Sequence, residues 1–388
     1  MLRALKLSLL QVARAVGVFK AAARSRRRSS QLLILCYHGI SIDDEHEWKP
    51  GLFMSAALFE SRLRRLRRGG YRVLGLGEAV ERLRAGTLPP RAVAITFDDG
   101  NLDFHRLAWP LLKQYGLPAT VYLTTYYCED NLPVFPLMLS FLLWKARGTR
   151  GRVDLPSGES ILVDATSEES RRIAELQLLT LAHDEDMSAF DKDNLARSVA
   201  RGLGIDYDDL VARRLLHLMN PAEVRELAAD GVDFQMHTHR HRSPLDEELY
   251  RAELQLNASR ITAMTGTTPL HFCYPSGTQK PQFEQWLTAE GVLSATTCER
   301  GMATPTSNSL RLPRLLDHST LTDVEFDAWL CGLGDLLPSR PVGTTDVDRA
   351  GRLVIERVPV RLHDAAVAGM AAISKVLRMA KVSGAPLE

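Results

Sequence analysis

Short apolar segments that end in polar residues restrict the fold of this chain more than any other feature. Ala92–Phe97 is such a segment, and it leads directly into Asp98-Asp99-Gly100. Leu32–Tyr37 and Ala119–Leu123 have the same character, and a helix is predicted over Leu107–Tyr115, before the last of the three. Segments that are apolar throughout are typical of strands buried on both faces. The order strand, helix, strand at this spacing favours βα units and a largely parallel sheet.

The pattern changes in the middle of the chain and again near its end. Two further strands are predicted at Val232–Met236 and His271–Tyr274. Between about 133 and 229 the sequence is instead typical of helices with charged faces, which indicates a helical insertion. We therefore predict an N-terminal helix within 1–30, an α/β domain over 31–340 that contains the insertion, and a tail over 341–388 that carries a helix.

The composition excludes several classes of protein. The 388 residues include 48 Lys and Arg and 47 Asp and Glu, so charge offers no argument for nucleic acid as a partner. The five cysteines are scattered without a CxxC pair, which indicates neither a zinc knuckle nor a disulfide framework. No segment reaches the roughly 18 uncharged apolar residues of a membrane span. We expect a cytoplasmic protein, and the sequence indicates no oligomeric state.

The N-terminal segment is basic and amphipathic. No acidic residue precedes Asp43, and apolar side chains recur three or four residues apart at Leu2, Leu5, Leu9, Val12, Val16 and Phe19. This spacing predicts one helix with a single apolar stripe. The stripe could lie on the anionic inner face of a membrane as a peripheral contact, or it could pack on the body of the protein. Periodicity does not decide between the two.

The first chemical cluster is Asp98-Asp99-Gly100 at the end of a predicted strand. Two adjacent carboxylates repel each other unless a cation or a proton separates them. They could therefore bind a divalent ion and supply a general base. The sequence Asp-Asp-Gly is also common in solvated turns, which is the alternative.

The second cluster places three imidazoles within five residues, at His237, His239 and His241. His237 and His241 would share a face of a helical turn, whereas His237 and His239 would converge if the strand continued. Imidazole pairs suit zinc and similar divalent ions. The alternative is an exposed basic run.

The third cluster, Tyr274-Pro275-Ser276-Gly277, forms a predicted tight loop after a strand. Such a loop could present backbone N–H groups to a developing oxyanion. One aspartate and two histidines would make a three-ligand site with an open position for water, and zinc lowers the pKa of such a water to about 7. The remaining aspartate would then take the proton of that water.

Together these clusters resemble the polysaccharide deacetylase family, also called the NodB-homology domain or carbohydrate esterase family 4. Thr96 to Gly100 matches the first motif of the family without a change, and His237 to His241 matches its second motif, H-[ST]-x-x-H. The Tyr-Pro-x-Gly sequence agrees with the third motif. The resemblance extends from Leu32 to Leu337 and implies a deformed (β/α) barrel with fewer than eight strands.

The resemblance also implies a division of roles. Asp98 would be the general base, while Asp99, His237 and His241 would hold the metal, with zinc the expected ion. Tyr274 would offer its backbone N–H to the oxyanion. His38, in a Tyr-His pair that many members share, would have a structural role.

The sequence departs from the family pattern in two places. Many members carry an arginine in the third motif that orients the catalytic aspartate, and Cys273 stands in the corresponding region here. The late motif with a catalytic-acid histidine is not clearly present, and His318 in Leu315-Leu316-Asp317-His318 is the nearest match.

The expected activity is removal of an N-acyl group, N-acetyl above all, from a sugar in a cell-surface polysaccharide or a lipid-linked glycan intermediate. Two alternatives remain open. One is a deformylase or other amide hydrolase acting on a lipid-linked sugar, and the other is a non-catalytic glycan-binding relative. The intact Asp98, Asp99, His237 and His241 favour an enzyme, because a binding module needs no base beside a metal.

Overall fold

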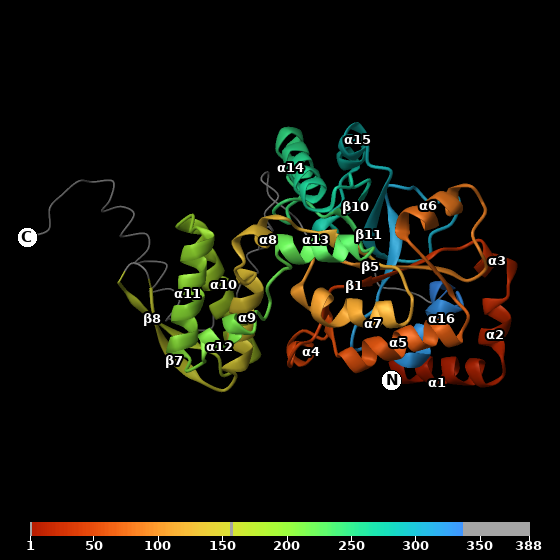
Figure 1. Ribbon diagram of the computed structural model, residues 1–388. Coiled ribbons are helices and arrows are strands. Elements are labelled where there is room, and N and C mark those ends of the chain that lie inside the picture. Colours follow the sequence, from red (N-terminus) through yellow and green to blue (C-terminus); the bar gives the residue numbers. More distant parts are fainter. Residues whose placement is uncertain (1, 156–157, 337–388) are drawn as a thin grey trace, which may run out of the picture. The chain divides into compact units, whose positions relative to one another are not determined.

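The computed structural model describes residues 2–155 and 158–336. Its main sheet is parallel throughout and closes into a barrel, because β1 pairs with β12 on one side and with β5 on the other (Figure 1). The order around the ring is β1 (Leu33–Tyr37), β12 (Leu312–Leu316), β11 (Ser294–Arg300), β10 (His271–Cys273), β9 (Asp233–Met236), β6 (Thr120–Leu123) and β5 (Ala92–Phe97). A further strand, β4 (Arg72–Leu74), pairs with β5 outside this ring.

Alternation of side chains along the strands creates two apolar layers. Leu33 and Leu35 of β1 belong to the large core that also contains helical residues such as Phe59 and Leu63. Ile34 instead shares a cluster with residues of β5, β6, β10 and β12, namely Ala92, Ala94, Tyr122, Cys273 and Leu312. A strand places successive side chains on opposite faces, so the first set packs under the outer helices and the second fills the barrel. Burial of both faces explains why these strands are apolar throughout.

Helices lie on the outside of the barrel and connect its strands. The Ser55 side chain accepts a hydrogen bond from the Leu58 N–H and so caps the first long helix of the barrel, α5. The connecting helices are α5 (Ala56–Arg68), α6 (Leu76–Arg84), α7 (Trp109–Gln114), α13 (Pro221–Ala229), α14 (Glu247–Thr265) and α15 (Pro281–Ala289), and α16 (Asp323–Leu330) follows the last described strand. Shorter elements are β2 (Gly39–Ile40), α4 (Glu45–Trp48), β3 (Phe53–Met54), the π-turn η1 (Phe104–Ala108), η2 (Pro275–Gly277) and η3 (Gly334–Leu336).

The insertion after β6 has its own apolar core, which includes Leu142, Leu178 and Leu195. Its elements are α8 (Tyr126–Asp130), α9 (Phe135–Lys145), β7 (Arg150–Asp154), β8 (Ser160–Asp164), α10 (Glu168–Asp184), α11 (Ala189–Gly202) and α12 (Tyr207–Ala212). The sequence prediction needs two corrections. The insertion is not wholly helical, because β7 and β8 form an antiparallel hairpin. It also ends near residue 216 and not at 229, since Val224 and Leu227 of α13 pack in the barrel core.

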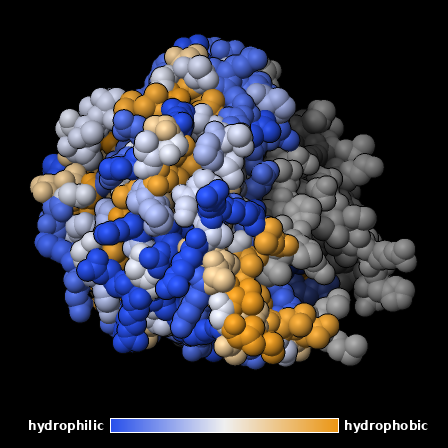
Figure 2. All heavy atoms as spheres, turned by 90° about the vertical axis from the view of Figure 1, so that its right-hand side faces the viewer, coloured by the Kyte–Doolittle hydropathy of each residue, from blue (hydrophilic) through white to orange (hydrophobic). Residues whose placement is uncertain are grey.

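The N-terminal segment forms three helices, and the single helix predicted over residues 2–19 is wrong. They are α1 (Leu2–Ala15), α2 (Val18–Ala23) and α3 (Arg26–Ser29), and the chain turns between the first two at Gly17, whose φ is 85°. Leu10 and Phe19 are buried against Val324 and Ala328 of α16. Apolar side chains gather at the lower edge of the view in Figure 2, the edge along which α1 runs in Figure 1.

None of the helices in the described part of the chain is both long enough and apolar enough to cross a bilayer. The helix predicted in the tail over 341–388 lies outside the described residues.

Candidate active site

Three of the predicted site residues, Asp98, Asp99 and His237, meet at one end of the barrel, together with His38. His38 follows β1, Asp98 and Asp99 follow β5, and His237 follows β9. All strands of the ring run in the same direction, so the loops after their carboxyl ends share one edge. This topology brings together residues that lie far apart in the sequence.

Asp99, His237 and His241 converge on one point. Asp99 Oδ1 lies 3.3 Å from His237 Nε2 and 3.3 Å from His241 Nε2. The two imidazole rings are 4.8 Å apart between centroids. One carboxylate oxygen and two imidazole nitrogens within 4.8 Å of one another form a donor set that suits a divalent ion.

The two histidines converge through a loop and not through a helical turn or a continued strand. Thr238 and His241 both have positive φ, at 58° and 54°, and Asp99 has a φ of 71°. Non-glycine residues in this region are strained, and they persist where the surrounding structure holds them. Here the Thr238 hydroxyl accepts a hydrogen bond from the Arg242 N–H at 2.9 Å. The loop therefore turns back on itself and brings the His241 imidazole beside that of His237.

Neighbouring groups fix which nitrogen of His237 faces the site. His237 Nδ1 donates to the backbone carbonyl of Cys273 at 2.8 Å, which leaves Nε2 toward Asp99. The His237 N–H donates to Asn257 Oδ1, and the Asn257 amide donates to the Leu123 carbonyl, so α14 ties the ends of β6 and β9 together.

The protonation states of His241 and Asp99 favour metal binding. Burial would lower the pKa of His237, but Cys273 and Asp99 outweigh burial and hold this pKa well above its ordinary value, so a metal would displace a proton from that imidazole. Burial lowers the pKa of His241 to about 4, so its imidazole is neutral and has a free lone pair at pH 7. Burial alone would raise the pKa of Asp99, but a hydrogen bond from His237 and the nearby His241 outweigh it and hold this pKa well below its ordinary value. Asp99 is thus a carboxylate.

Asp98 is held by an arginine and takes no part in this donor set. Arg314 of β12 donates two parallel hydrogen bonds to the Asp98 carboxylate, from Nη1 to Oδ1 and from Nη2 to Oδ2, each 2.7 Å long. Both side chains are buried. Burial would raise the pKa of Asp98, yet Arg314 outweighs burial and holds it well below the ordinary value. The adjacent aspartates therefore have different partners and different chemistry.

Sequence reasoning missed Arg314. The family's usual arginine is absent near Cys273, and Arg314 approaches the same aspartate from another strand, with Nη2 lying 3.0 Å from Cys273 Sγ. The available signal was a lone arginine inside the strand-length run Leu312–Leu316. A charged side chain in such a run must find a buried partner.

The other two members of the predicted clusters do not reach the metal donors. His239 is buried and shares a hydrogen bond of 2.8 Å with Thr125, so the second cluster is not an exposed basic run. The Tyr274 N–H donates to the Thr296 carbonyl at 3.2 Å. That group is occupied in pairing β10 with β11, so the structure contradicts the prediction that Tyr274 offers a free N–H to an oxyanion.

Two histidines differ in how near they come to this centre. His38 Nε2 lies 3.9 Å from Asp98 Oδ2, with Cys36 beside it. His318 follows β12 at the same edge, but its Nδ1 shares a hydrogen bond of 3.0 Å with Thr320 Oγ1. No ion pair or hydrogen bond joins His318 to the Asp98, Asp99, His237 or His241 side chains within the described residues.

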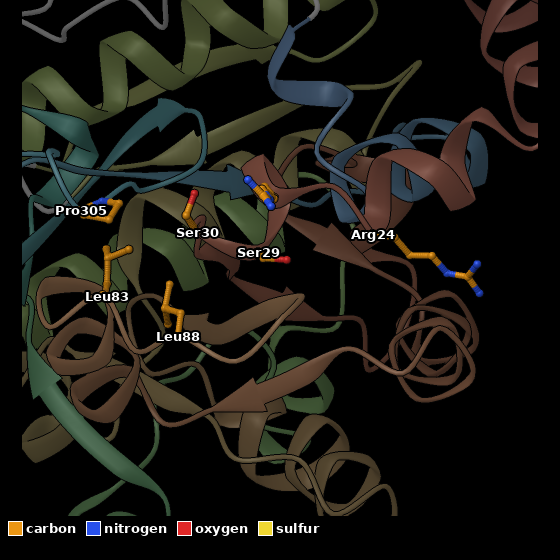
Figure 3. A pocket seen from close by; sticks show the side chains of 8 residues that line it. Arg24, Ser29, Ser30, Leu83, Leu88 and Pro305 are labelled. Carbon is orange, nitrogen blue, oxygen red and sulfur yellow. The ribbon is translucent and has the colours of Figure 1, made fainter.

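A pocket between the N-terminal segment and the barrel lies elsewhere (Figure 3). It is lined by Ser29 and Ser30, which precede β1, and by Leu88, which precedes β5. These positions belong to the amino ends of the strands, whereas the site lies at their carboxyl ends. The pocket is therefore separate from the candidate active site.

Fold and site together define a parallel α/β barrel with a carboxylate–imidazole donor set and a separate, arginine-held carboxylate at the carboxyl ends of its strands. The chain belongs to the polysaccharide deacetylase family, whose model matches residues 85–293, just over half of the chain. The family and the (β/α) barrel predicted from the sequence motifs are thereby confirmed.

Two curated relatives share short segments with this chain. The Bacillus subtilis (strain 168) protein YxkH, named as a polysaccharide deacetylase, is 35% identical over 97 residues, which are 25% of this chain and 33% of YxkH. A poly-β-1,6-N-acetyl-D-glucosamine N-deacetylase of Staphylococcus aureus (strain MSSA476) is 35% identical over 72 residues, which are 19% of this chain and 25% of that protein. The match thus spans no more than a third of either relative.

Solved structures agree on the fold over a longer range. The Streptococcus pyogenes deacetylase PplD, in complex with acetate, aligns with a TM-score of 0.51 at 17% identity and covers 78% of this chain and 98% of its own. IcaB from Ammonifex degensii aligns with a TM-score of 0.50 at 16% identity, with coverages of 79% and 98%. At these identities the likeness shows the fold alone.

Proposed function

We propose that this protein is a metal-dependent hydrolase that removes an N-acyl group, above all N-acetyl, from a sugar in a cell-surface polysaccharide or a lipid-linked glycan. The observation that carries the proposal is the pairing of two unlike aspartates. Asp99 lies with His237 and His241 in a metal-binding donor set, while Asp98 is held beside it by Arg314. A binding module would need no such carboxylate.

Each residue has a role that follows from its contacts. Asp99, His237 and His241 would hold the divalent ion, with zinc the ion that two imidazoles and one carboxylate suit best. When bound, such an ion polarises the amide carbonyl and makes water a nucleophile near neutral pH. Asp98 accepts the proton of the attacking water, and Arg314 fixes the direction in which its oxygens point.

The leaving amine needs a proton donor, and the contacts favour His38 over His318. His38 already lies 3.9 Å from Asp98, the group that collects the proton. His318 points to Thr320. His318 is the second candidate, because its loop adjoins the same edge of the barrel.

In this proposal the insertion governs access to the site, and its contacts with the site loops support that role. At its start, the Tyr126 N–H of α8 donates to the His239 carbonyl at 2.8 Å. Just after its end near residue 216, the Met219 N–H donates to the Gly100 carbonyl at 2.9 Å. Both ends of the insertion thus contact the loops that carry the site residues, so its bulk can shape which acylated sugars enter.

Metal content and turnover of paired variants test the proposal. Asp99→Ala should lose both metal and activity, because it removes a ligand. Asp98→Asn should keep the metal but lose about 10²- to 10⁴-fold in rate, the usual effect of removing a general base. His239→Ala is the matched control, and it should keep its metal because His239 bonds to Thr125.

The substrate assay uses short β-1,6-linked N-acetylglucosamine oligomers and their N-formyl counterparts, with metal measured by mass spectrometry. Faster release of formate than of acetate would favour a deformylase. Binding of oligomers without turnover by the metal-loaded protein would favour the non-catalytic relative. Loss of metal from Asp98→Asn with retention in Asp99→Ala would invert the roles of the two aspartates.

A further inference from the structure

Helix α1 carries an apolar stripe that the rest of the described chain does not cover. Leu5, Leu9, Val12 and Val16 are 59%, 62%, 60% and 71% exposed. Their spacing of four, three and four residues puts them on one face of α1 and of the turn at Val16 that follows it. Figure 2 shows the apolar patch at the edge where α1 runs. Packing on the protein's own body, one of the two alternatives left by the sequence, therefore does not account for this stripe.

A different face attaches α1 to the barrel. Leu10 and Phe19 are buried in a cluster with residues of α16. Lys6 Nζ lies 3.1 Å from Glu325 Oε1, and Arg14 Nη1 lies 3.2 Å from Asp327 Oδ2, so ion pairs hold both ends of this contact. Because the buried face is fixed, the stripe cannot turn inward without breaking these contacts.

The segment that carries the stripe has charges of one sign, and the acids of α16 that contact it, Glu325 and Asp327, are paired with Lys6 and Arg14. No acidic residue occurs before Asp43. Lys20 on α2, Arg24 just after α2 and Arg26 on α3 are exposed and form no ion pair with any residue that the structure describes. Exposed aliphatic side chains on a segment whose own charges are all basic are the pattern of helices that lie in the interface of an anionic bilayer.

We propose that α1 binds the surface of an anionic membrane, with Leu5, Leu9, Val12 and Val16 inserted among the lipids. A protein partner fits less well, because four aliphatic side chains offer less than the roughly 800 Å² per partner that a stable interface buries. A second copy would also bring the same basic residues against each other. The proposal is independent of the chemistry assigned to the barrel.

One contact that attaches α1 to the barrel also brings the start of this helix near the edge that carries the candidate active site. Arg3 Nη2 donates to the Thr320 carbonyl at 2.8 Å, in the loop that follows β12. That loop also holds His318, and it lies at the edge of the barrel that carries the candidate active site. The first turn of the lipid-binding helix thus adjoins the edge at which a substrate would enter.

Vesicle cosedimentation of the full chain tests this proposal with point variants. Binding should be strong to vesicles of phosphatidylglycerol and phosphatidylcholine, weak to phosphatidylcholine alone, and reduced by salt. Leu9→Glu with Val12→Glu should lower the partition coefficient by about tenfold or more, because two inserted side chains become charged. Phe190→Glu is the matched control, since Phe190 is an equally exposed apolar residue, at 67%, on the insertion.

Point variants are preferable to deletion of residues 1–30. Arg28 is buried and donates to the carbonyls of Leu330 and Ala92, so the deletion would damage the barrel as well. Circular dichroism and thermal unfolding should show the same fold in all variants, because the changed side chains are exposed.

Equal binding of wild type and the double variant to anionic vesicles would overturn the proposal. So would a dimer in solution that the double variant converts to monomer, which would show that a second copy covers the stripe. Binding that appears only after residues 337–388 are removed would show that the chain's own tail covers it.

Discussion

Asp98 and Arg314 compensate each other's burial through a paired set of hydrogen bonds. The guanidinium makes two hydrogen bonds of 2.7 Å to the carboxylate, and its Nε donates to the Thr297 carbonyl at 3.0 Å. A planar fork of donors fixes the carboxylate in orientation as well as in charge. Arg314 therefore acts on catalysis through Asp98 and is a positioning residue.

Arg314→Met should lower turnover by about 10²-fold while metal content stays unchanged, because misplacement of the base by about 1 Å has an effect of that size. Loss of the guanidinium should also raise the pKa of Asp98, which moves the acid limb of kcat/KM to higher pH. Arg314→Lys should recover the position of that limb in part, since it restores the charge without the fork. An unchanged pH profile in a folded, metal-loaded Arg314→Met would leave Arg314 with a structural role only.

The two histidines near the site can be separated by substitution. His38→Ala should reduce turnover about 10²- to 10⁴-fold if His38 protonates the leaving amine, and the loss should shrink for a substrate whose leaving group needs no proton. His318→Ala should then have a small effect. A larger loss of turnover in His318→Ala than in His38→Ala would assign the general-acid role to His318, as the sequence motif suggests. The measurement uses one amide whose leaving group needs a proton and one whose leaving group does not.

At the scale of elements, the insertion and the barrel are distinct in packing but joined at their boundaries. The Val134 N–H donates to the Leu216 carbonyl at 2.9 Å, and Pro133 pairs with His217, so the chain enters and leaves the insertion at adjacent positions. This geometry allows a short linker to replace most of the segment.

A variant in which a Gly-Ser linker replaces residues 135–215 should keep its metal and change its preference among acylated oligosaccharides of different length. Phe53 of β3 packs in the core of the insertion, so Phe53→Ser should accompany the replacement to avoid an exposed apolar surface. Metal content and the ratio of kcat/KM for short and long oligomers are the measurements. Loss of metal from a folded variant would show that the insertion supports the site itself.

At the scale of the whole molecule, the buried charges make stability depend on pH. Burial works to raise the pKa of Asp98, but Arg314 lowers it well below its ordinary value. A group whose pKa is depressed in the folded state contributes stability above its unfolded pKa, which is about 4, and loses it as pH falls toward the folded value.

In the metal-free protein, Asp98→Asn should lower the free energy of unfolding by roughly 3–5 kcal/mol at pH 7, because Arg314 is left without a buried counter-charge. This difference in the free energy of unfolding should shrink below about pH 4, because the ionised Asp98 of the wild type then contributes less to stability. Urea unfolding at a series of pH values measures it. A difference that grows with acidification would contradict the ion pair as the source of this stability.

The sequence by itself determined what is local in this protein. The apolar runs predicted strands because burial on both faces favours apolar side chains at every position, and the Asp-Asp-Gly and His-Thr-His-Arg-His motifs, through their resemblance to a family, indicated which side chains could hold a metal. These features depend on residues within a few positions of one another. They could be predicted without knowing which strands are neighbours.

The tertiary structure alone decided what depends on distant neighbours. Arg314 lies 216 positions from Asp98, and only closure of the barrel brings β12 close enough for the two to pair. Closure also pairs β10 with β11, which occupies the Tyr274 N–H. The docking of α1 on α16 decided which of its apolar side chains are buried. In each case the partner of a group is set by which strand or helix lies beside it, and local sequence pattern carries no information about that.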